Sequence, residues 1–236
     1  MPERHPLRTG AVAAIGGGLL ALIGNILHPR EPGQLDNAAS LFEVVAHTRI
    51  WVADHFLISI ALALLLNGFS ALTRSITGER GSAWAGFAWN IAVIGIVFGL
   101  ALMLTEATAV PALAEQWSNG SGPEKDLALA AGSAIFELSL TFSIGGMLFL
   151  FGLAPVLYGV AILTSHSYRP WLGWLGAVFG SVNVAGATIE LFTGEPALTF
   201  FVLFPLAAIV ITLWIIYLGV LMWQRAEPTL QPIGAA

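Results

Sequence analysis

The sequence contains no cysteine, so disulfide bonds, thiolate metal sites and a cysteine nucleophile are excluded. It also has little charge. Asp, Glu, Lys and Arg make up only 10% of the 236 residues, against about 25% in soluble domains. The nine Lys and Arg residues are scattered singly, so we expect no nucleic-acid partner. A chain with so few charged residues cannot cover a water-soluble globule, and a lipid bilayer must be the solvent for most of its surface.

Hydrophobic residues make up 57% of the chain, in runs long enough to cross a membrane. A transmembrane helix needs about 20 mostly apolar residues. The sequence predicts an all-α fold in which residues 1–236 form one integral membrane domain. Six transmembrane helices are expected, at 9–28, 50–73, 83–105, 134–163, 171–193 and 197–223. The first is long for a signal peptide and is expected to be retained. Pro155 should kink the fourth.

The positions of Lys and Arg predict the orientation. Six of them lie at the two ends of the chain and in the loops on the same side, namely Arg4, Arg8, Arg74, Arg80, Arg169 and Arg225. Arg30, Arg49 and Lys125 lie on the other side. Because cytoplasmic loops carry the excess of positive charge, both ends should be cytoplasmic and the protein multi-pass.

Two longer connections, about 29–49 and 106–127, are expected on the outer side. In the first, Asp36 is predicted to cap a short helix that lies on the membrane surface through one apolar face.

Ionisable side chains inside membrane helices are costly and are functional candidates for that reason. Five of the six helices carry such a group near the predicted outer face. The groups are His28, Asp54, His55, Glu106, Glu137 and Glu190. In a compact bundle several of them should meet in one shared outer pocket. The inner half offers only neutral groups, Asn67 and Asn90, with Asn183 near the middle of the fifth helix.

Imidazole and carboxylate groups together suit a divalent metal such as Zn, Fe, Cu or Mn, and they suit general acid–base chemistry equally well. The predicted catalytic carboxylates are Glu106, Glu137 and Glu190. The predicted metal ligands are His28, His55, Glu106 and Glu137, and the predicted substrate-pocket residues are Asp54, Ser59 and Asn183. Trp51, His55 and Ser59 repeat every four residues and share one helix face, so His55 could also bind a haem iron as cofactor ligand.

Each candidate also has a purely structural interpretation. His28 can simply end a helix before Pro29, and His55 can make a structural hydrogen bond to a carboxylate. Glu106 and Glu190 can be water-exposed carboxylates at the membrane interface. Asp54 can form an ion pair with Arg30 or Arg49, and Asn183 can make an interhelical hydrogen bond. No metal-binding H-E-x-x-H or E-x-x-H motif occurs in the sequence.

Three segments carry a resemblance to known proteins. Asn25-Ile26-Leu27-His28-Pro29, Trp51-x-x-x-His55 and the run from Arg169 to Gly176 resemble a group of small, mostly actinobacterial polytopic membrane proteins of unknown function. That resemblance implies a bacterial plasma membrane. Trp51-x-x-x-His55 alone is similar to the haem-binding styrene oxide isomerases, which implies haem at His55 and isomerase activity. Those enzymes carry Asn six residues after the histidine, where this chain has Ala61.

Three functions follow from these patterns. The first is a membrane-embedded enzyme or binding protein that acts on a lipophilic small molecule by acid–base, metal-assisted or haem-assisted chemistry. The second is a proton- or metal-coupled transporter, and the third is a non-catalytic accessory protein. The first is preferred because the ionisable groups are confined to the outer half of the membrane. Such an arrangement fits a binding pocket better than a transport pathway, which would need similar groups in the inner half. A homo-oligomer is compatible with all three.

Overall fold

The computed structural model describes residues 4–31, 33, 35–194 and 202–226. Within these residues the protein is all-α, as predicted, and six helices are long and apolar enough to cross a membrane. The helices are α1 (Arg4–Leu27), α2 (Ala38–His47), α3 (Trp51–Ser75), α4 (Glu79–Asn119), α5 (Pro123–Gly146), the π-helix η1 (Met147–Leu153), α6 (Ala154–Ser165), α7 (Pro170–Thr193) and α9 (Phe204–Ala226). The beginning of the sixth predicted span, 197–201, lies outside the described residues.

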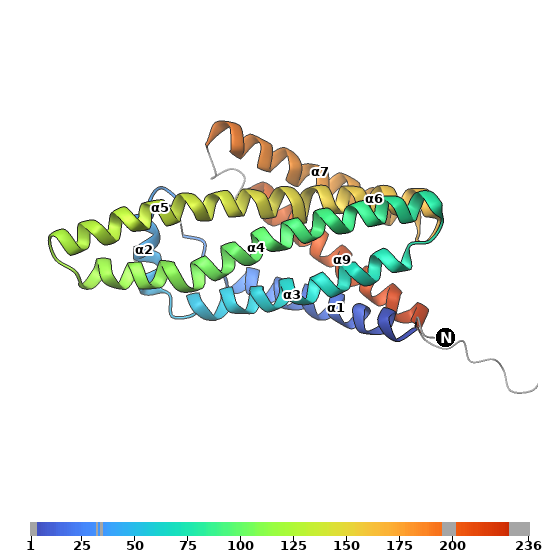
Figure 1. Ribbon diagram of the computed structural model, residues 1–236, viewed down its shortest axis with the longest axis horizontal. Coiled ribbons are helices and arrows are strands. Elements are labelled where there is room, and N and C mark those ends of the chain that lie inside the picture. The colour runs from blue at the N-terminus through green and yellow to red at the C-terminus, as the bar shows by residue number, and fades with distance from the viewer. Residues whose placement is uncertain (1–3, 32, 34, 195–201, 227–236) are drawn as a thin grey trace, which may run out of the picture.

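The beginning of α1 and the end of α9 lie at the same end of the bundle (Figure 1). The guanidinium carbon of Arg8 lies 4.2 Å from the centre of the Trp223 ring. We call this end the terminal end. The opposite end, where α1 finishes and α3 begins, is the cavity end. Six crossings place both ends of the described chain on one side of a membrane, and the Lys and Arg distribution predicts that this side is cytoplasmic.

Helices α4 and α5 form a hairpin that extends past the other helices at the cavity end (Figure 1). Helix α4 has 41 residues and is therefore roughly 60 Å long, about twice the thickness of a bilayer core. The connection expected at about 106–127 is helical over most of its length, because only residues 120–122 separate the two helices. Ala and Leu support helix through most of this segment, and Pro123 stands at the favoured first position of α5.

Helix α2 packs against this hairpin. Its N-cap is Asn37, one residue later than the predicted Asp36, and the Asn37 side chain accepts a hydrogen bond from the Ser40 amide at 3.0 Å. The apolar face of α2 is buried in a cluster with α4 and α5, where the ring of Phe42 lies against Gly132. The helix therefore covers protein at the cavity end rather than lying with its apolar face on the membrane surface.

The helix that continues from α5 is irregular just before Pro155, the residue at which the sequence predicts a kink. The Pro155 ring would clash with the carbonyl of Phe151 four residues earlier and supplies no N–H to bond it. The chain instead widens into the π-helix η1 immediately before α6. The freed Phe151 carbonyl accepts a hydrogen bond from Asn183 Nδ2 of α7 at 2.9 Å. A proline and an asparagine on neighbouring helices thus fix the widened turn.

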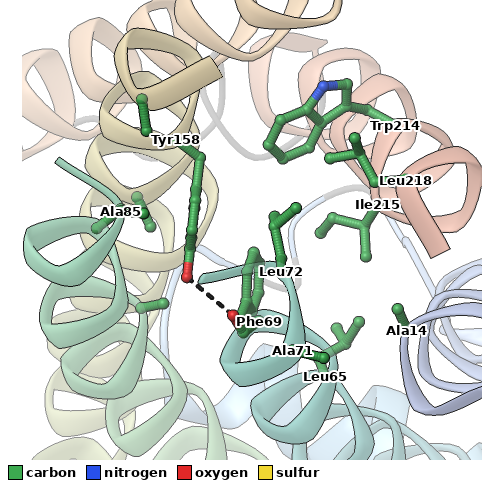
Figure 2. Packing of buried hydrophobic residues seen from close by; sticks show 14 of the residues in the cluster. Ala14, Leu65, Phe69, Ala71, Leu72, Ala85, Tyr158, Trp214, Ile215 and Leu218 are labelled. Atoms are coloured by element: carbon green, nitrogen blue, oxygen red, sulfur yellow. Dashed lines mark hydrogen bonds between the residues drawn. The ribbon is translucent and has the colours of Figure 1, made fainter. Parts of the chain in front are cut away.

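The terminal half of the bundle has a close-packed apolar core (Figure 2). Phe69, Leu72 and Tyr158 pack beside residues of α9 that include Trp214 and Leu218. Two buried polar groups of this core donate hydrogen bonds to backbone carbonyls: the Tyr158 hydroxyl donates to Phe69 at 3.2 Å, and Trp214 Nε1 donates to Leu172 at 2.9 Å. Aliphatic and aromatic side chains therefore fill the space between the cavity end and the terminal end.

Candidate functional site

Four ionisable side chains from three segments converge at the cavity end. His28 follows the end of α1, Asp54 and His55 lie in the first two turns of α3, and Glu106 lies in α4. Asp54 and His55 are 2% and 0% exposed. The side chains of His28 and Glu106 retain 13% and 16% exposure. The two outer members of the group are thus accessible, and the two between them are buried.

These side chains form an unbroken chain of short polar contacts. His28 Nδ1 lies 3.0 Å from Asp54 Oδ2, and Asp54 Oδ1 lies 2.8 Å from His55 Nδ1. On the other side of the ring, His55 Nε2 lies 2.8 Å from Glu106 Oε2. The Asp54 carboxylate therefore bridges two imidazoles, and His55 bridges two carboxylates.

The backbone determines where one proton sits. His55 Nδ1 lies 2.6 Å from the Trp51 carbonyl oxygen, which can only accept a hydrogen bond. Nδ1 therefore carries hydrogen and donates to Trp51 and Asp54. A second proton must lie between His55 Nε2 and Glu106 Oε2, because two bare acceptors would repel at 2.8 Å. Glu106 consequently shares a proton with a histidine whose other ring nitrogen contacts Asp54.

Trp51 holds this arrangement in place. Its indole Nε1 donates to the Glu106 backbone carbonyl at 2.7 Å, which ties the beginning of α3 to α4. Its ring centre lies 4.5 Å from that of His55 and 5.7 Å from that of His28. The hydroxyl of Ser59 donates to the His55 carbonyl at 2.9 Å, so its contact is with the backbone of α3 rather than with the cavity.

A cavity of about 150 Å³ lies between the helices next to Glu106 and Trp51. Its walls come from α1, α2, α3, α4, α5, η1, α7 and α9 and are mainly aliphatic and aromatic. Leu65, the deepest lining residue of α3, lies ten residues after His55 and hence roughly 15 Å further from the cavity end. The polar lining residues are Asn25, His28, Arg30, Glu106, Ser139, Ser143 and Glu190.

Two of these polar groups are buried and have no bonding partner among the residues that the structure describes. Glu190 is 6% exposed, and no described residue bonds or pairs with its carboxylate. Ser139 is 3% exposed, and its Oγ makes no hydrogen bond within the described residues. Buried polar groups are nearly always satisfied in proteins, and these two line the same cavity from α5 and α7 without a bonding partner among the described residues.

Four of the six predicted ionisable residues form the chain of polar contacts at the cavity end. Glu190 lines the adjacent cavity, and Glu137 belongs to neither the contact chain nor the cavity lining. Glu137 is exposed and does not line the cavity. The reason is helical phase: Phe136, Ser139, Leu140 and Ser143 form the inward stripe of α5, and position 137 is turned away from it. Asn183 does not line the cavity either. Its side-chain amide donates a hydrogen bond to the Phe151 carbonyl instead.

Sequence reasoning missed Ser139 and underrated Trp51. Ser139 had a usable signal, since a serine in an apolar membrane helix needs a hydrogen-bond partner. The sequence predicts that Trp51 shares a helix face with His55, while the contact of Trp51 with the backbone of α4 depends on the packing of two helices and has no sequence signal.

The site fits a metal ion only in part and does not favour haem. One ligand atom each from His28, Asp54 and His55 lie within 4.8 Å of one another, which a divalent cation could bridge. His55 Nδ1, however, donates to the Trp51 carbonyl and has no lone pair to offer in that state. Axial ligation of haem would require His55 Nε2 to leave Glu106, and the ring is fully buried. We therefore derive no step through haem.

Comparisons of the chain with protein-family models, with curated proteins and with solved structures give no significant match. The fold and the site define a multi-pass integral membrane protein with a buried histidine–carboxylate network at the edge of an apolar cavity.

Proposed function

We propose that this membrane protein is an enzyme that binds a lipophilic small molecule in the cavity and exchanges a proton with it through Glu106. The observation that carries the proposal is the coincidence of two features at one place. Glu106 lines an apolar cavity and, through its other contact, shares a proton with His55. A purely structural carboxylate would have no need of a cavity beside it.

We infer a lipophilic ligand because the side chains that line the cavity are mainly apolar. Side chains such as Ile58, Leu62, Leu102 and Met103 surround it, and apolar walls gain free energy by excluding water from apolar ligand surface.

The chemistry we infer is isomerisation by proton transfer. Glu106 takes a proton from a carbon next to a double bond of the ligand. The electron pair of the broken C–H bond forms a new double bond to the neighbouring carbon, and the electron pair of the original double bond shifts to its far carbon. The proton then returns at another carbon, so that atoms and charge balance without a further reactant. His55 stabilises the carboxylate through Nε2, and Asp54 keeps the imidazole oriented.

The test uses the full chain in nanodiscs incubated in D₂O with a lipid extract of its expression host. Extracted lipids are compared by mass spectrometry before and after incubation. We expect a lipophilic compound to gain carbon-bound deuterium with the wild type, and a loss of at least about 100-fold in that exchange with Glu106→Gln. Glu137→Gln is the matched control, because it makes the same change in an exposed carboxylate.

A second pair of variants tests the cavity itself. Gly146 lines the cavity, and a Cβ there meets nothing closer than 3.9 Å, so Gly146→Leu should fill the space and block exchange. Gly86→Leu places the same side chain where nothing lies within 4 Å and should leave exchange intact. Equal exchange in all variants would overturn the proposal. Elemental analysis of the same preparation decides whether His28, Asp54 and His55 hold a stoichiometric metal ion instead, with His28→Ala as its control.

A further inference from the structure

The Glu190 carboxylate is a buried acidic group that the proposed proton exchange does not use. It lies near the end of α7, lines the cavity and is 6% exposed. No described residue provides it with a hydrogen bond or a cation. An isolated carboxylate in an apolar environment is costly unless a partner compensates it. The cavity therefore has a place for a group of opposite charge.

The cations near the cavity are already committed. The Arg30 guanidinium donates to the Asn25 carbonyl at 3.0 Å and lies at the exposed rim. His28 pairs with Asp54, and His55 lies between Asp54 and Glu106. None of these groups reaches Glu190 in the described part of the chain. Among the described residues, Glu190 thus has no positively charged partner.

The remaining walls suit an organic cation. Trp51, Phe136, Phe151 and Phe204 line the cavity, and aromatic faces attract ammonium groups within about 6 Å. Ser139 adds an unpartnered Oγ that can accept an N–H hydrogen bond. Carboxylate, aromatic rings and a free hydroxyl oxygen together form a binding site for an amine.

We propose that the ligand of the cavity is a lipophilic amine whose ammonium group pairs with Glu190. This inference rests on the proposed binding of a lipophilic molecule and names its chemical class. Glu190 and Ser139 bind the polar head, the apolar walls hold the rest of the molecule, and Glu106 is left free for the proton exchange.

The experiment compares three photoreactive probes with the full chain in nanodiscs at neutral pH. The probes share a twelve-carbon chain with a diazirine near its end and differ only in the head group, which is an amine, an alcohol or a carboxylate. Crosslinks are located by peptide mass spectrometry. We expect the amine probe to label cavity-lining peptides at least about tenfold more than the alcohol probe, as a charge-assisted hydrogen bond predicts.

Variants assign this preference to its residues. Glu190→Gln keeps the shape and removes the charge, so labelling by the amine should fall about tenfold while labelling by the alcohol stays unchanged. Ser139→Ala should reduce labelling by the amine about threefold and supports the assignment even if Glu190→Gln does not fold. Glu137→Gln is the control and should change neither.

The outcomes separate this inference from the proposed function. Equal labelling of the cavity by the amine and the alcohol, unaffected by Glu190→Gln, would overturn the amine assignment and leave a lipophilic ligand in place. Preferred labelling by the carboxylate probe would also overturn it, since Arg30 would then be the binding group. No labelling of the cavity by any probe would contradict the proposed function itself.

Discussion

Asp54 is the residue on which the geometry of the site depends. Its two oxygens accept hydrogen bonds from two different imidazoles, at 3.0 Å from His28 and 2.8 Å from His55. The carboxylate is buried, so water cannot replace either partner. It belongs to α3, as His55 does, whereas His28 follows α1, which means that Asp54 also fixes the end of α1 against α3.

Asp54→Asn should therefore destabilise the protein. The asparagine side chain has one acceptor oxygen where the carboxylate has two, and its NH₂ group would face an imidazole N–H. We expect a loss of about 2–3 kcal/mol, the effect of leaving a buried charged-group hydrogen bond unmade, seen as a lower thermal midpoint in detergent. Histidine ¹⁵N NMR spectra should also change for His28 and His55. Glu137→Gln, an exposed carboxylate change, should leave both measurements as in the wild type.

Among the helices, the junction between η1 and α6 shows most clearly how one residue type, a proline, affects the backbone that lines the cavity. Pro155 forces the widened turn, and residues of that turn, Met147, Leu150 and Phe151, line the cavity. π-Helical turns frequently occur at functional sites. Here the wider backbone directs Leu150 and Phe151 toward the cavity, while Asn183 on α7 satisfies the carbonyl that the proline leaves unbonded.

A double-mutant cycle tests this account. Asn183→Leu removes the donor and should cost about 1–3 kcal/mol, because the Phe151 carbonyl is left buried and unpaired. Pro155→Ala restores an N–H to the helix, so it should reduce the cost of Asn183→Leu when the two changes are combined. Thermal midpoints of the four proteins give the coupling free energy. Asn90→Leu, at an exposed position of α4, is the control. Additive effects of the two substitutions would show that they are not linked through Phe151.

The positions of the helices were largely predictable from the sequence. Which ionisable side chains contact one another was predictable only in part. Hydropathy placed the spans and the common level of His28, His55, Glu106 and Glu190, because apolar run length measures depth. It could not give helical phase relative to neighbours. Glu106 and Glu137 lie at similar predicted depth, yet one faces the cavity and the other is exposed. The α4–α5 hairpin was missed because helix that continues beyond the membrane carries no hydropathy signal.

Across the whole molecule, polar chemistry is confined to the cavity end. The spans contain no Asp, Glu, Lys, Arg or His between that level and the residues at the terminal end, from Phe56 to Thr73 in α3 for instance. The cavity reaches Leu65 and Leu150, and beyond them Phe69, Leu72 and Trp214 pack closely together (Figure 2). A route for protons or metal ions needs groups that continue across the membrane, and the described helices offer only neutral hydroxyl and amide groups there.

The protein should therefore not conduct protons. Proteoliposomes with an imposed pH gradient and a trapped pH-sensitive dye should lose the gradient no faster than empty liposomes, for the wild type and for Glu106→Gln alike. The reason is that a proton leaving Glu106 toward the terminal end has no acceptor within the apolar core. A lipophilic ligand added to the membrane should not change the rate, because filling the cavity does not open the packed half. Gradient loss by the wild type that disappears in Glu106→Gln would favour a proton-coupled transporter over an enzyme, and the dry core would then have to open during turnover.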